Sequence, residues 1–247
     1  MSQVEGRNPV YETLRRGGVR RLLVASGSEG ERRVKEIVDL ARRKGVGVEF
    51  VDRRRLDSMS ETGRHQGVIA LAEAPGYASL RSILDRAKGD VCVVVLDGVQ
   101  DPQNLGSILR TADAAGVDAV VVPKKESVGL TPTVLRVSMG GAAGVPVARE
   151  SLYPAVKMLK EEGVKIIGVD ASGSVDYWEE DLTGSVALVL GGEGQGISPT
   201  LLGKCDSVVR IPMFGSVPSL NVGVAAALVL YERLRQAGAQ SKAKLTK

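Results

Sequence analysis

The stretch VCVVVLDGVQDPQNLGSILRTADAAGVDAVVVP, residues 91–123, decides the class of fold. Its first part, residues 91–97, is a near-continuous apolar run, as is typical of a β-strand in a sheet that is covered on both faces. A polar turn follows, then a helical pattern from about 103 to 116, and then a second apolar strand at 118–123. Strand, helix and strand in this order predict a parallel sheet flanked by helices, and therefore an α/β protein.

The same alternation continues toward the carboxyl end of the chain. We expect a short helix, a longer helix, three strands and a long apolar helix, at 131–138, 151–162, 164–170, 185–192, 207–213 and about 219–236. We assign residues 90–238 to one mostly parallel-sheet domain. The polar and basic residues 239–247 form a tail outside that domain.

A smaller unit precedes this domain. Residues 20–25, 46–51 and 67–73 read as strands, and residues 30–44 place Val34, Ile37, Val38 and Ala41 on one face of a helix. These elements predict a compact α/β domain over residues 1–73. Residues 74–89 begin with a Pro-Gly break, so we assign them to a linker.

The composition is that of an ordinary folded protein with a small positive excess. Hydrophobic residues make up 43% of the 247 residues and charged residues 25%, which is enough for a substantial core. Aromatic residues reach only 3%, which argues against a broad base-stacking surface. The net charge of +4 is compatible with a polyanionic partner without requiring one.

Cysteine usage and hydropathy give expectations about the compartment. Cys92 and Cys205 form no C-x-x-C pair, so we expect buried thiols and neither a disulfide nor a metal site. The first residues lack the apolar core of a signal peptide, and no apolar run reaches the length of a membrane span. These features predict a cytoplasmic protein with no membrane partner.

In open parallel sheets a ligand binds beyond the carboxyl ends of the strands, and the first motif follows such a strand end. Asn104 stands near the expected start of the helix after residue 97, where backbone N–H groups favour an anion. Arg110 lies further along the same helix. The alternative is that Asn104 is only a helix cap and Arg110 only a solvated surface charge.

The second motif, LVLGGEGQGIS at 188–198, places glycines around Glu193 at the end of a buried strand. Glycine permits positive φ angles and close approach of the backbone to a ligand. The spacing matches neither G-x-G-x-x-G nor a P-loop, which disfavours a nucleotide-dependent enzyme of those types. A tight turn without a ligand is the alternative.

The third motif, RIPMFGSVPSLNVGVAAALVLYE at 210–232, runs from a strand through a Pro- and Gly-containing loop into a helix. We expect Ser219 to cap that helix. The helix is apolar nearly all round, which predicts burial in the core or a dimer interface.

These three motifs, in this order and spacing, resemble those of the SpoU (TrmH) family of RNA 2′-O-ribose methyltransferases. The stretches at 5–17 and 64–73 are similar to the family's substrate-binding domain, so the resemblance covers nearly the whole chain. It implies an α/β fold in which an L30e-like RNA-binding domain precedes a parallel-sheet domain with a deep trefoil knot. It further implies S-adenosylmethionine as cofactor and a homodimer through the knot and the C-terminal helix, without metal.

The resemblance also implies a set of site residues. Cofactor contacts fall on Gly191, Gly192, Ile211, Met213 and Leu220, with Ser219 close by. Catalytic candidates are Asn104, Arg110, Glu193, Ser219 and Asn221. The implied substrate is structured RNA, with a guanosine of 23S rRNA favoured and tRNA as the alternative. A non-catalytic RNA-binding protein of the same fold is the rival interpretation.

Charged residues of the N-terminal domain complete the expectations. Runs of arginine recur there, at 15–16, 20–21, 32–33, 42–43 and 53–55. We expect them to contact RNA phosphates, although charge runs usually only form a solvated face. His65, the single histidine, lies away from all three motifs. We therefore expect it to have a structural role or to contact RNA.

Overall fold

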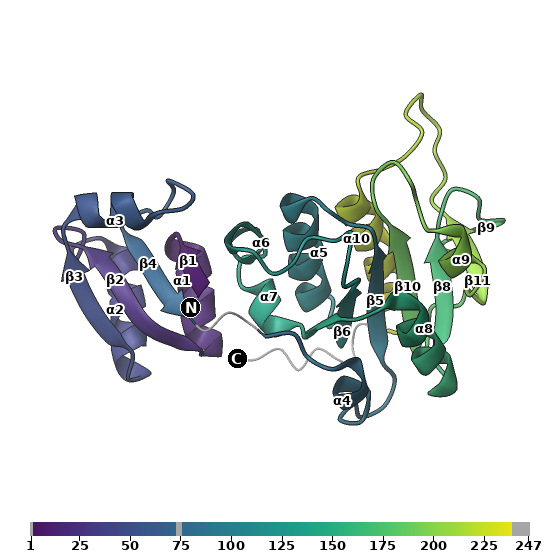
Figure 1. The fold of residues 1–247 in the computed structure, drawn as a ribbon, viewed down its shortest axis with the longest axis horizontal. Helices are drawn as coiled ribbons and strands as arrows, with labels where there is room; N and C mark the ends of the chain where they lie inside the picture. The colour runs from purple at the N-terminus through teal and green to yellow at the C-terminus, as the bar shows by residue number, and fades with distance from the viewer. Residues whose placement is uncertain (1, 73–75, 239–247) are drawn as a thin grey trace.

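The computed structural model describes residues 2–72 and 76–238 and contains two sheets, each with its own helices (Figure 1). We call residues 2–72 the N-terminal half and residues 76–238 the C-terminal half. The basic tail at 239–247, the last residue of the expected strand at 67–73 and the first two residues of the expected linker, 74–75, lie outside the described residues. None of the described helices is both long and apolar enough to cross a membrane.

The N-terminal half is a four-stranded mixed sheet in the order β1-β4-β2-β3. Strand β4 pairs antiparallel with β1 and β2, and β2 pairs parallel with β3. The expected helical face of α2 is buried, so this part of the prediction is confirmed. The elements are β1 (Ser2–Glu5), α1 (Arg7–Arg16), β2 (Val19–Ala25), α2 (Arg32–Arg43), β3 (Gly47–Val51), α3 (Arg53–Met59) and β4 (Val68–Ala72).

Glu5 ties the end of β1 to the loop that precedes β4. Glu5 is only 3% exposed. Its carboxylate accepts hydrogen bonds from the side chains of Gln3, Ser60 and Thr62 and from the backbone N–H of Glu61. Burial raises the pKa of the carboxyl, but the hydrogen bonds lower it more. The pKa therefore lies below its ordinary value of 4.5.

The depressed pKa of Glu5 makes the stability of this half depend on pH. The stabilisation is complete above pH 4.5 and is lost as the pH falls through the lower pKa of the folded state. Glu5→Gln should lower the free energy of unfolding at pH 7 by about 1–3 kcal/mol. The difference from the unmutated protein should shrink at pH 3.5. Urea unfolding at both pH values measures it, and a difference independent of pH would contradict this account.

The C-terminal half is a seven-stranded sheet in the order β7-β6-β5-β10-β8-β11-β9, and every pair in it is parallel. This confirms the predicted parallel-sheet α/β class. The strands are β5 (Cys92–Asp97), β6 (Ala119–Val122), β7 (Val147–Arg149), β8 (Lys165–Val169), β9 (Val175–Asp176), β10 (Val186–Gly191) and β11 (Ser207–Arg210). The helices are α4 (Leu80–Leu84), α5 (Pro102–Ala114), α6 (Pro132–Val137), α7 (Gly141–Gly144), α8 (Leu152–Glu161), α9 (Pro199–Leu202) and α10 (Val222–Gln236).

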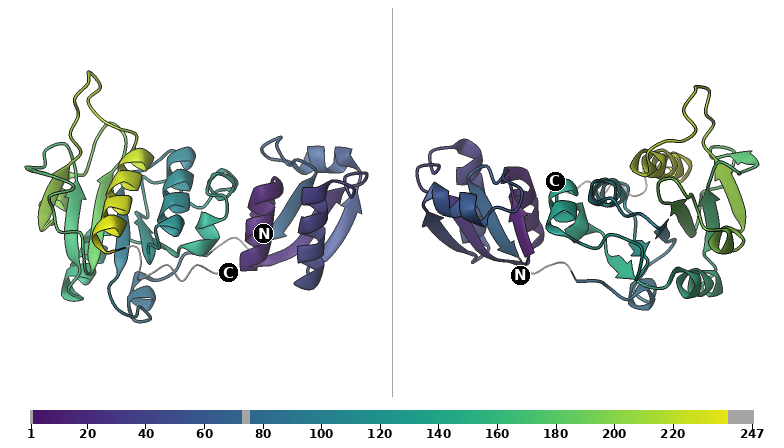
Figure 2. Two further views of the ribbon diagram at one scale, coloured as in Figure 1. Left: turned by 180° about the vertical axis from the view of Figure 1, so that it is seen from behind. Right: turned by 45° about the horizontal axis from the view of Figure 1, so that its top comes forward.

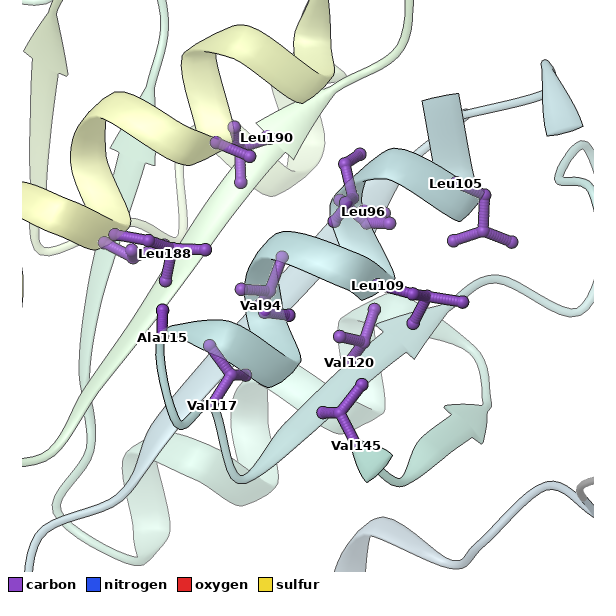
Figure 3. Close-up of a cluster of buried hydrophobic side chains, with 14 of the residues drawn as sticks. Val94, Leu96, Leu105, Leu109, Ala115, Val117, Val120, Val145, Leu188 and Leu190 are labelled. Atoms are coloured by element: carbon purple, nitrogen blue, oxygen red, sulfur yellow. The ribbon is translucent and has the colours of Figure 1, made fainter. Parts of the chain in front are cut away.

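Successive residues of β5 enter two different cores, one on each face of this sheet. Val94 and Leu96 point to a core that α5, α6 and α10 complete, whereas Val93 and Val95 point to one that α4 and α8 complete. Figure 3 shows the first core, where residues of α5 meet those of β5 and β10. Double-sided burial is the physical reason for the unbroken apolar run in the sequence.

Two boundaries differ from those expected. The third motif leaves the sheet at Arg210 rather than 213, and α10 starts at Val222 rather than 219. Ser219 is therefore not the cap: Asn221 is, since its Oδ1 accepts hydrogen bonds from the N–H groups of Gly223 and Val224. Pro212 and Pro218 lie in the intervening loop, where they contribute no N–H to either element.

The segment assigned to the linker includes structured residues. Leu80 and Ile83 of α4 are buried against the sheet of the C-terminal half. The hydroxyl of Tyr77 accepts a hydrogen bond from the N–H of Leu130. Ala78 forms an isolated parallel β-bridge with Ala148 of β7. The limits of 74–89 for the linker remain our proposal, and these contacts show that its later part packs with the C-terminal half.

Candidate active site

The carboxyl ends of β5, β10, β8 and β11 meet at one edge of the sheet. Gly191 at the end of β10 lies opposite Asp97 at the end of β5, and β8 pairs with both β10 and β11. The loop from β11 to α10 projects beyond this edge (Figure 1). Motifs that are separate in the chain therefore converge, as the sequence predicts.

A hollow of about 410 Å³ lies at this edge, and we call it the cofactor hollow. Its volume falls within the range of small-molecule sites. It is lined by all five residues expected at the cofactor: Gly191, Gly192, Ile211, Met213 and Leu220. Glu193 and Ser219 line it as well. Its other lining residues include Val169, Leu190, Pro218, Val222 and Ala225, so the walls are largely apolar.

Two of these glycines are required by close packing of the backbone. A Cβ atom on Gly191 would lie 1.9 Å from the carbonyl carbon of Gly196, and one on Gly192 would lie 2.2 Å from the carbonyl oxygen of Gly98. The Gly192 N–H donates to the carbonyl of Asp97 at 2.6 Å. The N–H of Ser198 donates to the Asp97 carboxylate at 2.8 Å. The glycine motif is thus folded back against the first motif.

Asp170 also lines the cofactor hollow, and the sequence analysis missed it. Burial raises the pKa of its carboxyl, but hydrogen bonds from the Ser172 backbone and hydroxyl and from the Ile197 backbone lower it more. The carboxylate is therefore charged at neutral pH. Asp170 directly follows β8, so the rule about strand ends could have found it.

Asn104, Glu193 and Asn221 form a hydrogen-bonded cluster at the rim of the cofactor hollow. The Nδ2 of Asn104 donates to Oε1 of Glu193 at 2.5 Å, and Nδ2 of Asn221 donates to Oδ1 of Asn104 at 2.8 Å. Asn221 Nδ2 also lies 3.2 Å from the same Glu193 oxygen. Each residue comes from a different motif, so the cluster joins all three.

Asn104 lies in the first turn of its helix, close to the expected start, but it is not the cap. Asp101 is the cap, since its side chain accepts a hydrogen bond from the Gln103 N–H, and Pro102 is the first helical residue. The Asn104 side chain is buried, with the residue only 7% exposed, and turns toward Glu193. The cap interpretation of Asn104 is therefore wrong.

The structure leaves Arg110 outside this group. It is exposed, six residues after Asn104 on α5, which is about 9 Å along the helix axis. It does not line the cofactor hollow. The expected catalytic residues therefore fall into two sets. Glu193 and Ser219 line the hollow, and Asn104 and Asn221 are hydrogen-bonded to Glu193. Arg110 stands apart from these four.

His65 and the cysteines take no part in the site. His65 is buried in the N-terminal half, where Nε2 lies 2.8 Å from Asp57 and Nδ1 accepts a hydrogen bond from the Gly67 N–H. Cys92 is buried in the core, and burial raises the pKa of the Cys205 thiol to about 11. Among the described residues, no three His, Cys, Asp or Glu side chains gather as a metal site would require.

A parallel sheet with a glycine-walled hollow at its carboxyl edge, preceded by a small mixed sheet, defines a two-part α/β enzyme that holds a nucleoside-sized ligand. Family models identify both parts. Residues 91–231 match the SpoU rRNA Methylase family, and residues 3–78 match the RNA 2′-O ribose methyltransferase substrate binding family. The chain belongs to the SpoU family of RNA 2′-O-ribose methyltransferases, enzymes that use S-adenosylmethionine. The family implies the trefoil knot.

Individual relatives cover nearly the whole chain. The 23S rRNA (guanosine-2′-O-)-methyltransferase RlmB of Pseudomonas syringae is 42% identical over 91% of this chain and 90% of its own length. YacO of Bacillus subtilis, described as a TrmH-family tRNA/rRNA methyltransferase, is 39% identical over 94% and 95%. The SpoU methyltransferase AviRb from Streptomyces viridochromogenes, solved with AdoMet, is 28% identical, with a TM-score of 0.77 over 95% of this chain and 89% of its own.

Proposed function

We propose that this protein methylates the ribose 2′-hydroxyl of a guanosine in 23S rRNA. The observation that carries the reaction type is the Asn104–Glu193–Asn221 cluster at the rim of the cofactor hollow. The relatives favour 23S rRNA, since RlmB is 42% identical, whereas the name of YacO leaves tRNA open. A ribosomal substrate would place the enzyme in the cytoplasm.

The residues of the cofactor hollow fit S-adenosylmethionine. Apolar side chains of Ile211 and Leu220 can cover the faces of an adenine, and the exposed backbone around Gly191 offers hydrogen-bonding groups to its edge. The Asp170 carboxylate can accept hydrogen bonds from ribose hydroxyls or attract a cationic group. When bound, the cofactor supplies a methyl group on a positively charged sulfur, which needs no metal for activation.

The rim residues would then hold the RNA hydroxyl. Asn104 and Asn221 both donate to one oxygen of Glu193 and so fix the carboxylate. We propose that the second oxygen of Glu193 accepts a hydrogen bond from the ribose 2′-hydroxyl and takes its proton as the new oxygen–carbon bond forms. Ser219 would help to orient the nucleotide from the opposite loop.

Arg110 would act on the RNA rather than on the cofactor. A guanidinium is a poor base, because arginine is not deprotonated in proteins. It can instead clamp the phosphate next to the target ribose and stabilise negative charge that develops on the oxygen. Exposure on α5 suits contact with a bulky polyanion.

The structure sorts the arginines of the N-terminal half by whether they already have an acidic partner. Arg15 pairs with Glu12, Arg16 with Asp113, and Arg32 and Arg33 with Glu36. Arg21 and Arg55 share Glu49. The positive charge of these runs is therefore partly neutralised, so fewer arginines are available to bind RNA phosphates.

One hollow gathers arginines with polar neighbours, and we call it the arginine hollow. It measures about 490 Å³ and is lined by Arg7, Asn8, Arg33, Arg53 and Gln66. Two of its arginines are already paired, Arg7 with Glu31 and Arg33 with Glu36, so binding of an anion there would depend most on Arg53. Gln66 has a φ of +53°, a left-handed conformation that non-glycine residues seldom adopt. Such strain clusters at binding sites. We propose that this hollow holds a backbone phosphate of the substrate RNA.

Arg53→Ala should weaken RNA binding through electrostatics alone. Losing one phosphate contact should lower the slope of log K against log salt by about one and weaken affinity equally for different sequences. Arg42→Ala is the matched control, because Arg42 lies on α2 nine residues beyond Arg33, which lines the hollow, and is about 14 Å from it along the helix axis. Filter binding over a salt series measures both, and equal effects of the two changes would count against the arginine hollow.

We also propose a homodimer through α10. One side of this helix is buried, at Val222, Ala226, Val229 and Leu230. The opposite side leaves Val224, Leu228 and Tyr231 exposed next to Tyr177. The buried side confirms the expected burial in the core, and the exposed apolar side supports the proposed dimer. Analytical ultracentrifugation tests the association.

Transfer of tritiated methyl groups tests the activity. Unmethylated 23S rRNA, 16S rRNA and tRNA are incubated in parallel with the protein and the labelled cofactor, and the labelled nucleotide is then mapped. We expect 2′-O-methylguanosine in 23S rRNA. Label in tRNA would support the alternative substrate, and binding of RNA without any transfer would support a non-catalytic protein.

A further inference from the structure

The two halves of the molecule meet at a surface that also contains a cavity of about 290 Å³, lined by residues of both halves. Strand β1 packs against α6, and α1 packs against α7. Figures 1 and 2 show α1 beside α7. At this surface Arg16, the last residue of α1, donates through both terminal nitrogens to the Asp113 carboxylate, at 3.0 and 2.5 Å. The two side chains are 29% and 27% exposed, so the pair is partly shielded from water.

Gly144 lies directly against the Arg16–Asp113 pair. A Cβ atom there would lie 1.5 Å from Nη1 of Arg16 and 1.9 Å from Oδ1 of Asp113. Both atoms are at the ends of flexible side chains, so an added methyl group would displace the pair rather than the backbone. A Cβ on Gly140, whose φ of +94° already favours glycine, would lie 2.7 Å from Cβ of Glu12. Glycines of the C-terminal half thus leave room for side chains of α1.

The docking surface adjoins the segment of α5 that carries Arg110. Asp113 follows Arg110 by one helical turn. A Cβ on Gly141 would lie 2.8 Å from Cα of Arg110, so α7 packs directly on the backbone at that residue. The N-terminal half therefore rests on the helix that connects the rim cluster, through Asn104, with Arg110.

We propose that the Arg16–Asp113 pair is a latch that holds the N-terminal half in one orientation relative to Arg110 and the cofactor hollow. This inference rests on the proposed function. RNA gripped by the N-terminal half is then presented with its ribose at a fixed distance from the reacting site, which is how positioning accelerates a reaction. Arg16 and Asp113 are positioning residues: they govern turnover and leave the affinities for RNA and cofactor unchanged.

The test uses the full chain and charge reversal on each side of the pair. Arg16→Asp, Asp113→Arg and the double swap are compared with Gly144→Ala, which should disturb only the ends of these two side chains. Arg81→Asp is the control, because it breaks the Arg81–Glu162 pair within the C-terminal half. Dyes on Ser58→Cys and Lys157→Cys, both exposed, report the distance between the halves by single-molecule energy transfer. The buried Cys92 and the high pKa of Cys205 limit competing labelling.

We expect each single reversal, and Gly144→Ala, to broaden the distance distribution and lower kcat by about fivefold, the effect of losing one partly exposed pair. The double swap should restore a narrow distribution and most of the turnover. Unchanged distributions, broadening without loss of kcat, or failure of the swap to restore either property would overturn the latch. Energy transfer needs no catalysis, so an unmutated protein that methylates no RNA would refute the proposed function and still leave the docking measurable.

Discussion

Arg110→Ala is expected to lower kcat by about 100- to 1,000-fold, the cost of removing a group that stabilises charge in a transition state. The Kd for S-adenosylmethionine should change less than about twofold, because Arg110 does not line the cofactor hollow. The separation follows from geometry: the cofactor residues lie beyond the sheet edge, whereas Arg110 is exposed further along α5. Single-turnover methyl transfer and calorimetry measure the two quantities independently.

Two further variants sharpen this prediction. Arg110→Lys keeps the charge and loses the two-pronged hydrogen bonding, so it should recover only part of the activity. Arg86→Ala removes another arginine of the C-terminal half, one that bonds only to Ser82 in its own segment, and should leave kcat unchanged. Loss of cofactor affinity equal to the loss of turnover in Arg110→Ala would show that the arginine shapes the cofactor hollow instead.

The class of fold could be predicted because it depends on long apolar runs. The run at 91–97 has to be buried on both faces, and only a parallel sheet covered by helices does this readily. Short elements could not be found in this way. β9 and α7 are two and four residues long, and β1 is set by pairing with β4, nearly 70 residues away. Local sequence carries little information about such partners.

The site could be predicted residue by residue where a motif fixed the backbone, and less well where side chains decide. The glycines and the apolar residues at 211 and 220 reach the cofactor hollow as expected. The sequence predicts the wrong cap for α10, because Ser and Asn are both good cap residues. Only the hydrogen bonds from the N–H groups of Gly223 and Val224 identify Asn221, and not Ser219, as the cap. No pattern in the sequence indicated that Arg16 would meet Asp113, since that contact depends on how two separately folded sheets dock.

Helix α5 links the parts of the enzyme. Its first turn holds Asn104 against Glu193, its middle presents Arg110, and its last turn binds Arg16 through Asp113. Leu105 and Leu109 of the same helix are buried in the core shown in Figure 3. A rigid helix of this kind keeps the groups that meet the ribose, the phosphate and the N-terminal half at fixed spacings, which a loop could not do.

Gly191→Ala is expected to weaken S-adenosylmethionine binding by at least about 100-fold, or about 2.7 kcal/mol. The added methyl group would lie 1.9 Å from the carbonyl carbon of Gly196 and 2.3 Å from the N–H nitrogen of Ile197. These are backbone atoms that cannot rotate away, so the 192–198 loop must move as a unit. That loop forms one wall of the cofactor hollow.

The displaced loop has consequences on both sides of the cofactor hollow. Its contacts with the first motif, through Asp97 to Gly192 and Ser198, would lengthen, and Glu193 would leave Asn104. Gly215→Ala is the matched control, because Gly215 lies in the β11–α10 loop and a Cβ there meets nothing within 4 Å. Circular dichroism should show both variants folded, since overpacking costs about 1–3 kcal/mol. A folded Gly191→Ala protein that binds the cofactor as tightly as the Gly215→Ala control would place the cofactor somewhere other than this hollow.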